Sequence, residues 1–336
     1  MIAHNKPTLG KEEQQAVFKV LDSGFIAQGS EVEKFENEFC DFLGLPHRHA
    51  VALSSGTSAL FMALWSLKAK KKSIAMPVYV CSSLRNAVAM VQAKEVLIDN
   101  ATDSPNINLN QLQKSNSDIA IVPHMFGLPN EIQNIKDIDI IEDCAQSLGA
   151  SIDNKKTGLI GKAGIFSFYA TKLMTSGGQG GMFVSKDKNL VDKVRDYREF
   201  DCRRDQKERF NFQMTDIQAS IGRVQLKKLP SFLERRQEIF AIYKDSGLDL
   251  IASENNASVH YRAVIRINNP AEVKDKLLKQ SIKTIIPIEE WELLGDGDNY
   301  KNSYNLTQTT LSLPIYPSLT NKDALTIVNQ LDKAIQ

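Results

Sequence analysis

Cysteine is scarce in this sequence, and its spacing excludes two kinds of small protein. Only four cysteines occur among 336 residues, and no two of them form a C-x-x-C pair. A disulfide-stapled secreted scaffold needs a much higher density of cysteine, and a structural zinc site needs closely spaced Cys or His ligands. We therefore expect free thiols, a reducing cytoplasm as the location, and no bound metal.

An excess of one charge and long apolar runs are also missing. Lys and Arg number 41 against 40 Asp and Glu, so the formal net charge is +1. Nucleic-acid-binding proteins usually carry a marked basic excess, and a membrane-spanning helix needs about 18 or more successive apolar residues. Residues 1–7 lack the basic and then apolar pattern of a signal peptide. These absences predict a protein without nucleic-acid or membrane partners.

Common nucleotide-binding and hydrolase motifs are absent as well. No G-x-G-x-x-G follows a strand pattern, and residues 158–162 have neither the spacing of a P-loop nor Ser or Thr after the lysine. No nucleophile elbow or Ser-His-Asp set is visible. Dinucleotide-binding enzymes, P-loop ATPases and serine hydrolases are therefore disfavoured.

The patterns that are present predict a two-domain α/β protein. With 42% hydrophobic and 24% charged residues, the chain can bury a sizeable core, and its length suits two units of roughly 100–200 residues. Between residues 50 and 190, helical patterns alternate with strands that are apolar throughout, which indicates a mostly parallel sheet covered by helices on both faces. The expected strands are 50–53, 73–76, 96–99, 119–123, 138–142, 163–168 and 181–185.

A smaller α+β unit is expected at the C-terminal end. A helical pattern covers 215–229, and Pro230 restarts a second pattern that continues to residue 243. A strand at 261–267 and helices at 273–280 and 322–335 follow. We place the large domain at residues 1–228 and the small domain at 229–336.

The first chemically suggestive segment is a turn between an expected strand and an expected helix. It contains Gly56, Thr57 and Ser58. The glycine allows close approach of the backbone, and two hydroxyls lie beside the unpaired N–H groups of a helix N-terminus, so the segment can bind an anion. An ordinary Ser/Thr helix cap explains the same residues.

Two further segments follow expected strands. Asp143 ends an apolar strand, and at the carboxyl end of a sheet a poorly solvated carboxylate favours a cationic partner such as a protonated ring nitrogen. A helix-capping Asp is the alternative. Lys172 follows the next strand, five residues after Ser167, and precedes a glycine-rich run at 176–181. Most lysines are solvated surface charges, but a lysine in a partly desolvated pocket can attack a carbonyl as the neutral amine.

The fourth segment, residues 210–216, reads as the start of a helix capped by Thr215, and nothing in the residue types alone makes Asn211 functional. In order and spacing, however, the four segments resemble those of the DegT/DnrJ/EryC1/StrS sugar aminotransferase family. The similarity covers nearly the whole chain and includes residues 6–13, 24–29, 124–127, 218–222 and 313–317. It implies pyridoxal phosphate (PLP) as the cofactor and the fold-type I aminotransferase architecture.

The resemblance also implies roles for individual residues. Lys172 would bond covalently to PLP and act as general base, Asp143 would keep the pyridine nitrogen protonated, and Gln146 would bind the phenolic oxygen. The phosphate would be held by Gly56, Thr57, Ser58 and Ser167, and by Asn211 of the neighbouring subunit. This arrangement implies a homodimer with shared sites, glutamate as amino donor and a nucleotide-linked keto sugar as acceptor.

The sequence departs from the family pattern mainly around the substrate. Cys81 stands where an aromatic ring commonly stacks on PLP, and either Cys81 or Tyr79 would take that place. Gln179 and Gln213 replace an acidic residue and an arginine, and residues 287–291 lack the usual Pro-x-x-x-His run. A non-sugar acceptor therefore stays open. The alternatives to an aminotransferase are a PLP-dependent sugar dehydratase, which typically has His in place of Lys172, and a non-catalytic regulatory protein.

Overall fold

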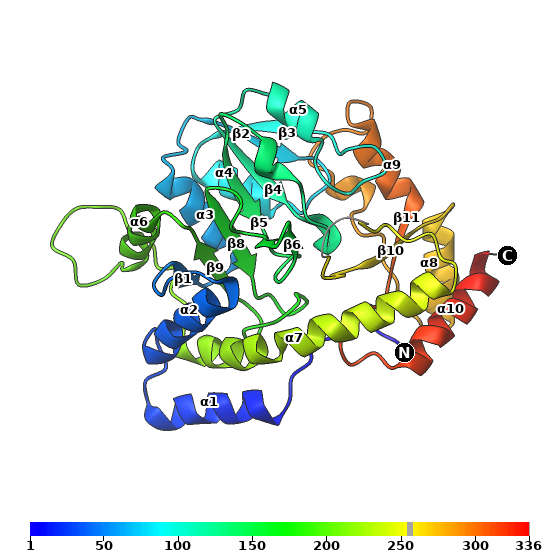
Figure 1. Cartoon of the computed structure of the whole chain (residues 1–336), viewed down its shortest axis with the longest axis horizontal. Coiled ribbons are helices and arrows are strands. Elements are labelled where there is room, and N and C mark those ends of the chain that lie inside the picture. The colour runs from blue at the N-terminus through cyan, green and yellow to red at the C-terminus, as the bar shows by residue number, and fades with distance from the viewer. Residues whose placement is uncertain (254–257, 336) are drawn as a thin grey trace.

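A seven-stranded sheet forms the centre of the large part of the molecule (Figure 1). The computed structural model describes residues 1–253 and 258–335. From edge to edge the strands are β1 (Ala50–Leu53), β9 (Gly181–Val184), β8 (Ala163–Ser167), β5 (Asp139–Asp143), β4 (Ile119–Pro123), β2 (Ser73–Pro77) and β3 (Lys94–Ile98). Only β9 runs antiparallel to its neighbours in this sheet. The predicted mostly parallel sheet is confirmed.

Both faces of the sheet are buried, as the uniformly apolar strands predicted. On β1, Val51 and Leu53 belong to one hydrophobic cluster, whereas Ala50 and Ala52 belong to a second cluster on the opposite face. Successive side chains of a strand point to opposite faces, so burial of all four requires cover on both sides. The helices of this part of the chain are α1 (Lys11–Ser23), α2 (Ser30–Leu43), α3 (Gly56–Ser66), α4 (Ser83–Met90), α5 (Leu109–Lys114) and α6 (Lys188–Arg198).

The C-terminal part forms a smaller α+β unit with its own hydrophobic cluster. Its two strands pair antiparallel and are flanked by helices. Its elements are β10 (Ala263–Arg266), α8 (Pro270–Lys279), α9 (Lys301–Thr309), β11 (Thr310–Leu313) and α10 (Asn321–Ile335). Two further strands, β6 (Ser151–Ile152) and β7 (Lys155–Lys156), form a separate hairpin, and three short 3₁₀ helices are η1 (Met125–Gly127), η2 (Ile132–Asn134) and η3 (Glu290–Glu292).

One long helix, α7 (Asp216–Asp245), connects the two parts (Figure 1). The expected restart at Pro230 was wrong, because the helix continues through this proline. Proline removes one backbone donor, but α7 packs against α1 and α2 along one half and against α10 along the other. The predicted boundary between residues 228 and 229 falls inside α7, and the division into two domains stays a prediction. Residues 254–257 and 336 of the predicted small domain lie outside the described residues.

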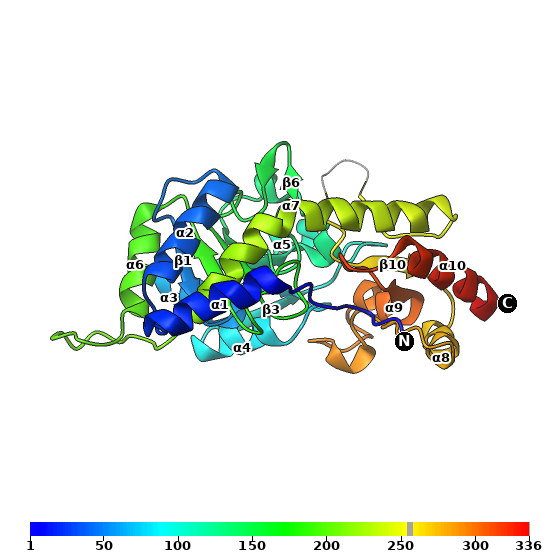
Figure 2. The same ribbon diagram turned by 90° about the horizontal axis from the view of Figure 1, so that it is seen from below.

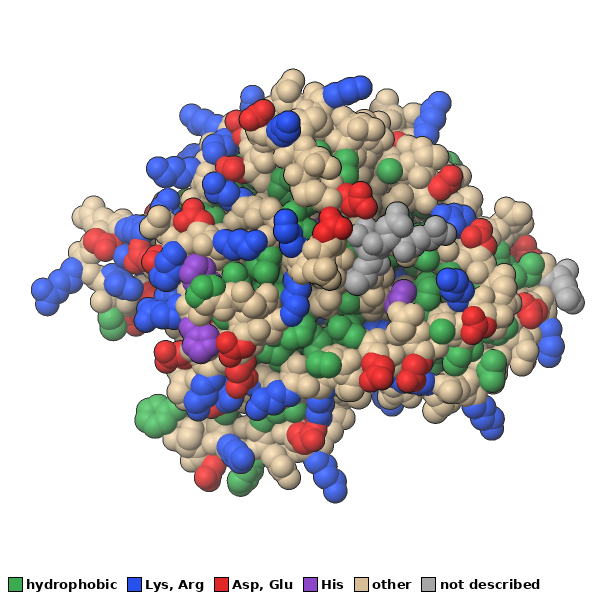
Figure 3. Space-filling view, in the orientation of Figure 1, with side chains coloured by type: hydrophobic (Ala, Val, Ile, Leu, Met, Phe, Trp, Pro, Cys, Tyr) green, Lys and Arg blue, Asp and Glu red, His purple; other side chains and the backbone are tan. Residues whose placement is uncertain are grey.

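The N-terminal segment joins the two parts a second time. Ile2 exchanges backbone hydrogen bonds with Ser281 and Lys283 (2.8 and 2.9 Å), so the chain begins against the small unit before α1 packs on α7. Figure 2 shows both termini at the end of the molecule that holds α8 and α10. On the face in Figure 3, acidic and basic side chains are interspersed. Within the described ranges, no helix is both long and apolar enough to cross a membrane.

Candidate active site

A pocket of about 280 Å³ lies where four strands of the large sheet end and α3 begins. β2, β4, β5 and β8 are mutually parallel, so their carboxyl ends meet at one edge, which is where ligands bind in open α/β sheets. The pocket brings together seven of the predicted residues: Gly56, Thr57, Cys81, Asp143, Gln146, Ser167 and Lys172. Ser58 and Asn211 are not among its lining residues.

The start of α3 forms one wall of the pocket. The Ser55 hydroxyl accepts the backbone N–H of Ser58 (3.0 Å), and the Ser58 hydroxyl in turn accepts the backbone N–H of Ser55 (2.9 Å). This capping box directs the Ser58 side chain toward Ser55. Gly56 and Thr57 line the pocket with first-turn N–H groups, which have no partner within the helix. An anion can bind to these groups.

Close packing between α3 and β8 requires a glycine at position 56. A Cβ atom on Gly56 would lie 2.8 Å from Cβ of Ser167 and 3.1 Å from its hydroxyl. The Ser167 side chain therefore reaches the same place as the helix N-terminus. Gly56, Thr57 and Ser167 together form a compact polar wall of the pocket.

Asp143, at the end of β5, is a buried carboxylate with few protein partners. It is 8% exposed, and its Oδ1 accepts the backbone N–H of Ala145 (2.9 Å). Burial raises the pKa of Asp143, which the Ala145 hydrogen bond and the nearby Lys172 and His124 offset only in part. A buried carboxylate with unused acceptor capacity is suited to a cation or a protonated nitrogen inside the pocket.

Lys172 is half-buried on the segment that follows β8. Its backbone is fixed by a hydrogen bond to the carbonyl of Tyr169 (2.9 Å), and its Nζ lies over the ring of Tyr261, 5.4 Å from the centroid. In the described part of the chain its amine makes no hydrogen bond or ion pair. A lysine amine that the protein leaves without a partner, beside Asp143, is available to a ligand.

Gln146 and the turn after β4 form another wall of the pocket. The Gln146 side-chain oxygen accepts the backbone N–H of Phe126 (2.8 Å), and Phe126 occupies the left-handed region with φ 60°. His124 and Met125 of this turn also line the pocket. The hydrogen bond holds Gln146 in place and keeps its NH₂ group for other partners, among them Met125 Sδ at 3.7 Å.

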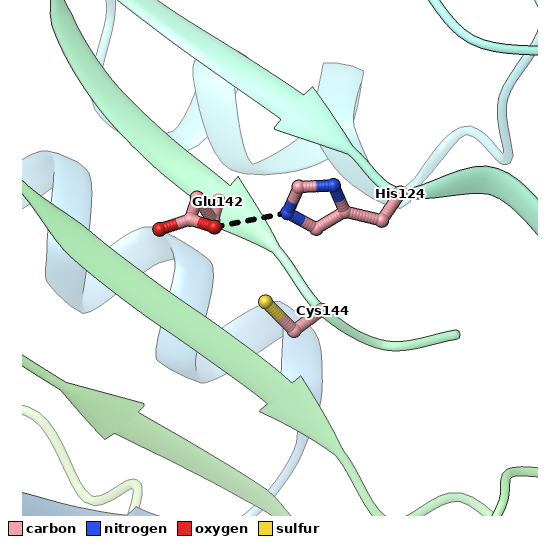
Figure 4. A group of neighbouring side chains, drawn as sticks. All are labelled: His124, Glu142 and Cys144. Carbon is pink, nitrogen blue, oxygen red and sulfur yellow. Dashed lines mark hydrogen bonds and ion pairs between the residues drawn. The ribbon is translucent and has the colours of Figure 1, made fainter. Parts of the chain in front are cut away.

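A second buried network lies behind the pocket and involves His124 and Glu142 (Figure 4). His124 Nδ1 accepts the backbone N–H of Asn130 (2.9 Å), so Nε2 carries the proton and donates to Glu142 (3.0 Å). Glu142 also accepts the backbone N–H groups of Gly158, Ile160 and Gly161 at 2.7–2.8 Å. Although burial opposes it, these donors and His124 lower the pKa of Glu142.

This network accounts for the one group of side chains with metal-ligand chemistry in the described ranges. Cys144 Sγ lies near His124 and Glu142, and all three are buried. The oxygens of Glu142 and both ring nitrogens of His124 already make hydrogen bonds. Burial raises the pKa of the Cys144 thiol well above its usual value, which disfavours the thiolate that a metal needs. The group therefore has a structural explanation.

The structure separates the two candidates for the position over the cofactor ring. Cys81 is exposed, lines the pocket and lies 2.8 Å from the Ser83 hydroxyl. Tyr79 is fully buried and packs edge-on against Phe126, with centroids 6.3 Å apart. Cys81 therefore faces the pocket and Tyr79 faces the core, so the aromatic side chain does not reach the pocket from position 79.

Asn211 lies on the projecting connection between α6 and α7 (Figure 1). It is exposed between Phe210 and Phe212, whose rings stack 5.6 Å apart and pack against Phe61 of α3. The backbone N–H of Ser54 donates to the Phe212 carbonyl (2.8 Å), which fixes the connection beside the turn before α3. Sequence reasoning gave no role to several other lining residues, including Ser55 and Tyr169, or to Tyr261, whose ring lies beside the Lys172 amine. Ser55 and Tyr169 follow the ends of β1 and β8, which could have indicated them, whereas Tyr261 precedes β10 and carries no such signal.

A free lysine amine, an open buried carboxylate and a helix N-terminus that converge at the carboxyl edge of such a sheet define the site of a PLP-dependent enzyme of fold-type I. The three groups fit the carbonyl, the ring nitrogen and the phosphate of PLP. Residues 7–332 match the model of the DegT/DnrJ/EryC1/StrS aminotransferase family. The chain belongs to this family, is an enzyme and uses PLP, which confirms the resemblance in the sequence.

Individual proteins are similar to the chain over nearly its whole length. The chain is 32% identical to the protein MJ1066 of Methanocaldococcus jannaschii, over 98% of this chain and 96% of the relative. It is 26% identical to a dTDP-4-dehydro-2,3,6-trideoxy-D-glucose 4-aminotransferase of Saccharopolyspora spinosa, over 100% and 97% of the two chains. The crystal structure of the aminotransferase TlmJ from Streptoalloteichus hindustanus matches the fold with a TM-score of 0.93, 24% identity and coverage of 99% and 98%. The predicted fold class is confirmed.

Proposed function

We propose that this aminotransferase moves an amino group from glutamate to a nucleotide-linked keto sugar, in amino-sugar synthesis for a surface polysaccharide or glycoconjugate. The observation that carries the proposal is the convergence of Asp143 and Lys172 in one pocket of a chain whose relative is named for a dTDP-linked keto sugar. The four free cysteines favour the cytoplasm as the compartment.

The chain's own residues supply binding and proton transfer. Bound PLP supplies an electron sink for the substrate carbon that loses its proton. Asp143 would hold the ring nitrogen protonated, the start of α3 with Gly56, Thr57 and Ser167 would bind the phosphate, and Gln146 would bind the phenolic oxygen. The Lys172 amine would move the proton at the reacting carbon. Cys81 would contribute to the part of the pocket next to the ring.

The competing functions are less well supported by the same residues. A dehydratase of this fold typically has histidine where this chain has Lys172. A regulatory protein without catalysis has no need for a lysine amine and a carboxylate held open in one pocket. An aminotransferase explains both.

A homodimer with shared sites belongs to the proposal. The groove of about 910 Å³ between α1, the turn after it and α7 carries exposed apolar side chains, among them Phe25 and Ile26. A second subunit would cover this apolar surface. Asn211, exposed and outside its own chain's pocket lining, would contact the phosphate in the partner's site. The Ser58 hydroxyl would then contribute by capping α3 rather than by direct contact with the phosphate.

The absorbance of the PLP-loaded protein tests the donor half of the reaction. Addition of L-glutamate should replace the long-wavelength band of the loaded enzyme by the shorter-wavelength band of the aminated cofactor, and a keto-sugar nucleotide should restore the first band. A band that persists with glutamate but disappears with another amino acid would contradict the donor. A nucleotide sugar that loses water without any donor would establish the dehydratase instead.

Shared sites are tested by mixing two inactive subunits, Lys172→Ala and Asn211→Ala, under conditions that exchange subunits. A mixed dimer would contain one site with both native residues, so each mixed dimer should have about half of the native activity, and an equal mixture after random exchange about a quarter. Mixing that restores no activity, although mixed dimers form, would contradict a shared site.

A further inference from the structure

Arg262 is a half-buried arginine that has no anionic partner among the described residues. Its guanidinium lies beside the ring of Tyr261, 5.5 Å from the centroid, and in the described ranges it makes no hydrogen bond or ion pair. Every other described arginine that is not exposed pairs with a carboxylate or donates to backbone carbonyls. A guanidinium is costly to desolvate without such a partner, which indicates that the partner comes from a ligand.

Arg262 lies against the wall of the PLP pocket. Its backbone N–H donates to the carbonyl of Phe126 (3.4 Å), and Phe126 in turn donates to Gln146 in the pocket wall. A Cβ atom on Gly127 would lie 3.0 Å from the backbone nitrogen of Tyr261. The start of β10 and the turn that carries His124 and Met125 are therefore packed tightly together.

Arg262 and Lys172 approach the same aromatic ring. Lys172 Nζ lies 5.4 Å from the Tyr261 centroid and Arg262 Cζ lies 5.5 Å from it, so the two cations are separated by no more than the sum of these distances. Burial would raise the pKa of Tyr261, but Lys172, Arg262 and Arg236 outweigh it and lower that pKa. Three cationic side chains therefore lie near Tyr261, beside the reacting amine.

We propose that Arg262 binds a carboxylate of the amino-acid donor and thereby selects an amino acid for the first half of the reaction. The inference rests on the proposed aminotransferase function and adds a specificity-determining residue to it. An amino acid that reacts at Lys172 brings at least one carboxylate within a few ångströms of its amine, and a guanidinium fork binds carboxylate with two parallel hydrogen bonds.

The test uses the PLP-loaded enzyme and glutarate, a dicarboxylate that has no amine and cannot react. Calorimetric binding of glutarate is measured for the native protein, Arg262→Met, Arg262→Lys and the control Arg266→Met. Arg266 is the last residue of β10, the strand that begins directly after Arg262, and is already paired with Asp249 (3.1 Å). We expect at least about a tenfold loss of glutarate affinity in R262M, a smaller loss in R262K and no change in R266M. Native binding by R262M, or no binding by the native protein, would overturn the proposal.

Kinetics separate the donor from the acceptor and from a structural role. R262M should raise KM for glutamate about 10–100-fold with little change in kcat, and R262K should recover part of this loss. KM for the nucleotide sugar should stay within about twofold of the native value, because a contact made only to the donor leaves acceptor binding unchanged. An effect confined to the nucleotide sugar would assign Arg262 to the acceptor's phosphates and overturn the proposal. If no amino acid aminates the cofactor, the proposed function fails, whereas glutarate binding still tests Arg262.

Discussion

Glu142 and Asp143 are neighbours on β5 and both are buried, but their surroundings differ sharply. Glu142 accepts hydrogen bonds from His124 and from three backbone N–H groups, and its pKa is lowered. Asp143 accepts one from Ala145, and burial raises its pKa. The saturated carboxylate joins strands and loops of the fold, whereas the open carboxylate has capacity left for a ligand.

The same contrast separates the interface of α1 and α7 from the pocket. On α7, Lys228 pairs with the buried Glu13 (2.9 Å) and with Glu12. In the pocket, the Lys172 amine makes no hydrogen bond or ion pair with the described residues and lies over the ring of Tyr261. Two lysines of the same chain thus differ in role: Lys228 forms ion pairs that hold α1 against α7, whereas the Lys172 amine stays available to a ligand. Substitutions should affect stability in the first case and activity in the second.

Replacement of Lys172 should give the largest effect. We expect Lys172→Ala to lower the rate of the glutamate half-reaction by at least about 10³-fold, because it removes the general base and the covalent anchor of PLP. Its free energy of unfolding without PLP should stay within about 0.5 kcal/mol of the native value, since no protein hydrogen bond is lost. Lys228→Ala is the matched control. It should keep native activity but lower the free energy of unfolding by about 1–3 kcal/mol. If both substitutions lowered activity and stability to the same extent, the two lysines would not differ in role as we infer.

Asp143→Asn should have the next largest effect. The amide keeps the shape of the side chain but cannot hold a protonated ring nitrogen, so the half-reaction with glutamate should slow about 10²–10³-fold. Stability without PLP should be unchanged or higher at neutral pH, because burial of the ionised Asp143 is unfavourable. Asp139→Asn, on the same strand but near the surface, should leave both quantities unchanged. A large loss of stability in Asp143→Asn would show that Asp143 serves the fold.

Glu142→Gln should act mainly on stability. The new NH₂ group would face backbone donors that the carboxylate accepts, so we expect a loss of about 2–3 kcal/mol in the free energy of unfolding at pH 7. The lowered pKa of Glu142 sets the sign of the pH dependence. Its stabilisation is complete above the usual glutamate pKa and is lost as the pH falls through the lower pKa of the folded state.

Urea titrations of the native protein and Glu142→Gln between pH 7 and pH 3 measure this difference. The gap between the two proteins should shrink as the pH falls. Glu95→Gln is the control, since Glu95 forms an exposed pair with Arg85 and should change stability by less than about 1 kcal/mol. A gap that stays constant with pH would show that Glu142 stabilises through its shape and not through its charge.

The sequence predicted the strands of the large sheet and the residues at their ends because both depend on local patterns. Asp143 and Lys172 could be found from apolar runs that stop at a polar residue. In contrast, α6 was not predicted, and α7 was predicted as two helices, because Pro230 is a local signal and the packing of α7 against α1, α2 and α10 is not. The hydrogen bonds that occupy the Glu142 carboxylate were not predictable either. Its backbone donors come from residues 158–161, a loop separate in sequence from β5.

The pocket shows the same limit of local patterns. The ring of Tyr261 lies beside the Lys172 amine although Tyr261 stands almost ninety positions further along the chain, and no spacing rule connects the two residues. The choice between Cys81 and Tyr79 depended on the direction of two side chains at the end of β2. Both questions require tertiary structure, because they concern which distant surfaces meet.

The smallest predicted effect concerns the close contact of α3 with β8. The polar wall of the pocket formed by Gly56, Thr57 and Ser167 depends on this contact. Gly56→Ala would place a Cβ atom 2.8 Å from Cβ of Ser167, so one of the two elements must shift, and we expect a loss of about 1 kcal/mol of stability without PLP. Ser167→Gly removes the opposing atoms and should relieve most of this loss in the double variant, which a double-mutant cycle measures as a coupling energy. Gly10→Ala is the control, because its nearest atom would lie at an ordinary 3.7 Å. A cycle without coupling would contradict direct contact, and the cost of Gly56→Ala would then arise within α3 itself.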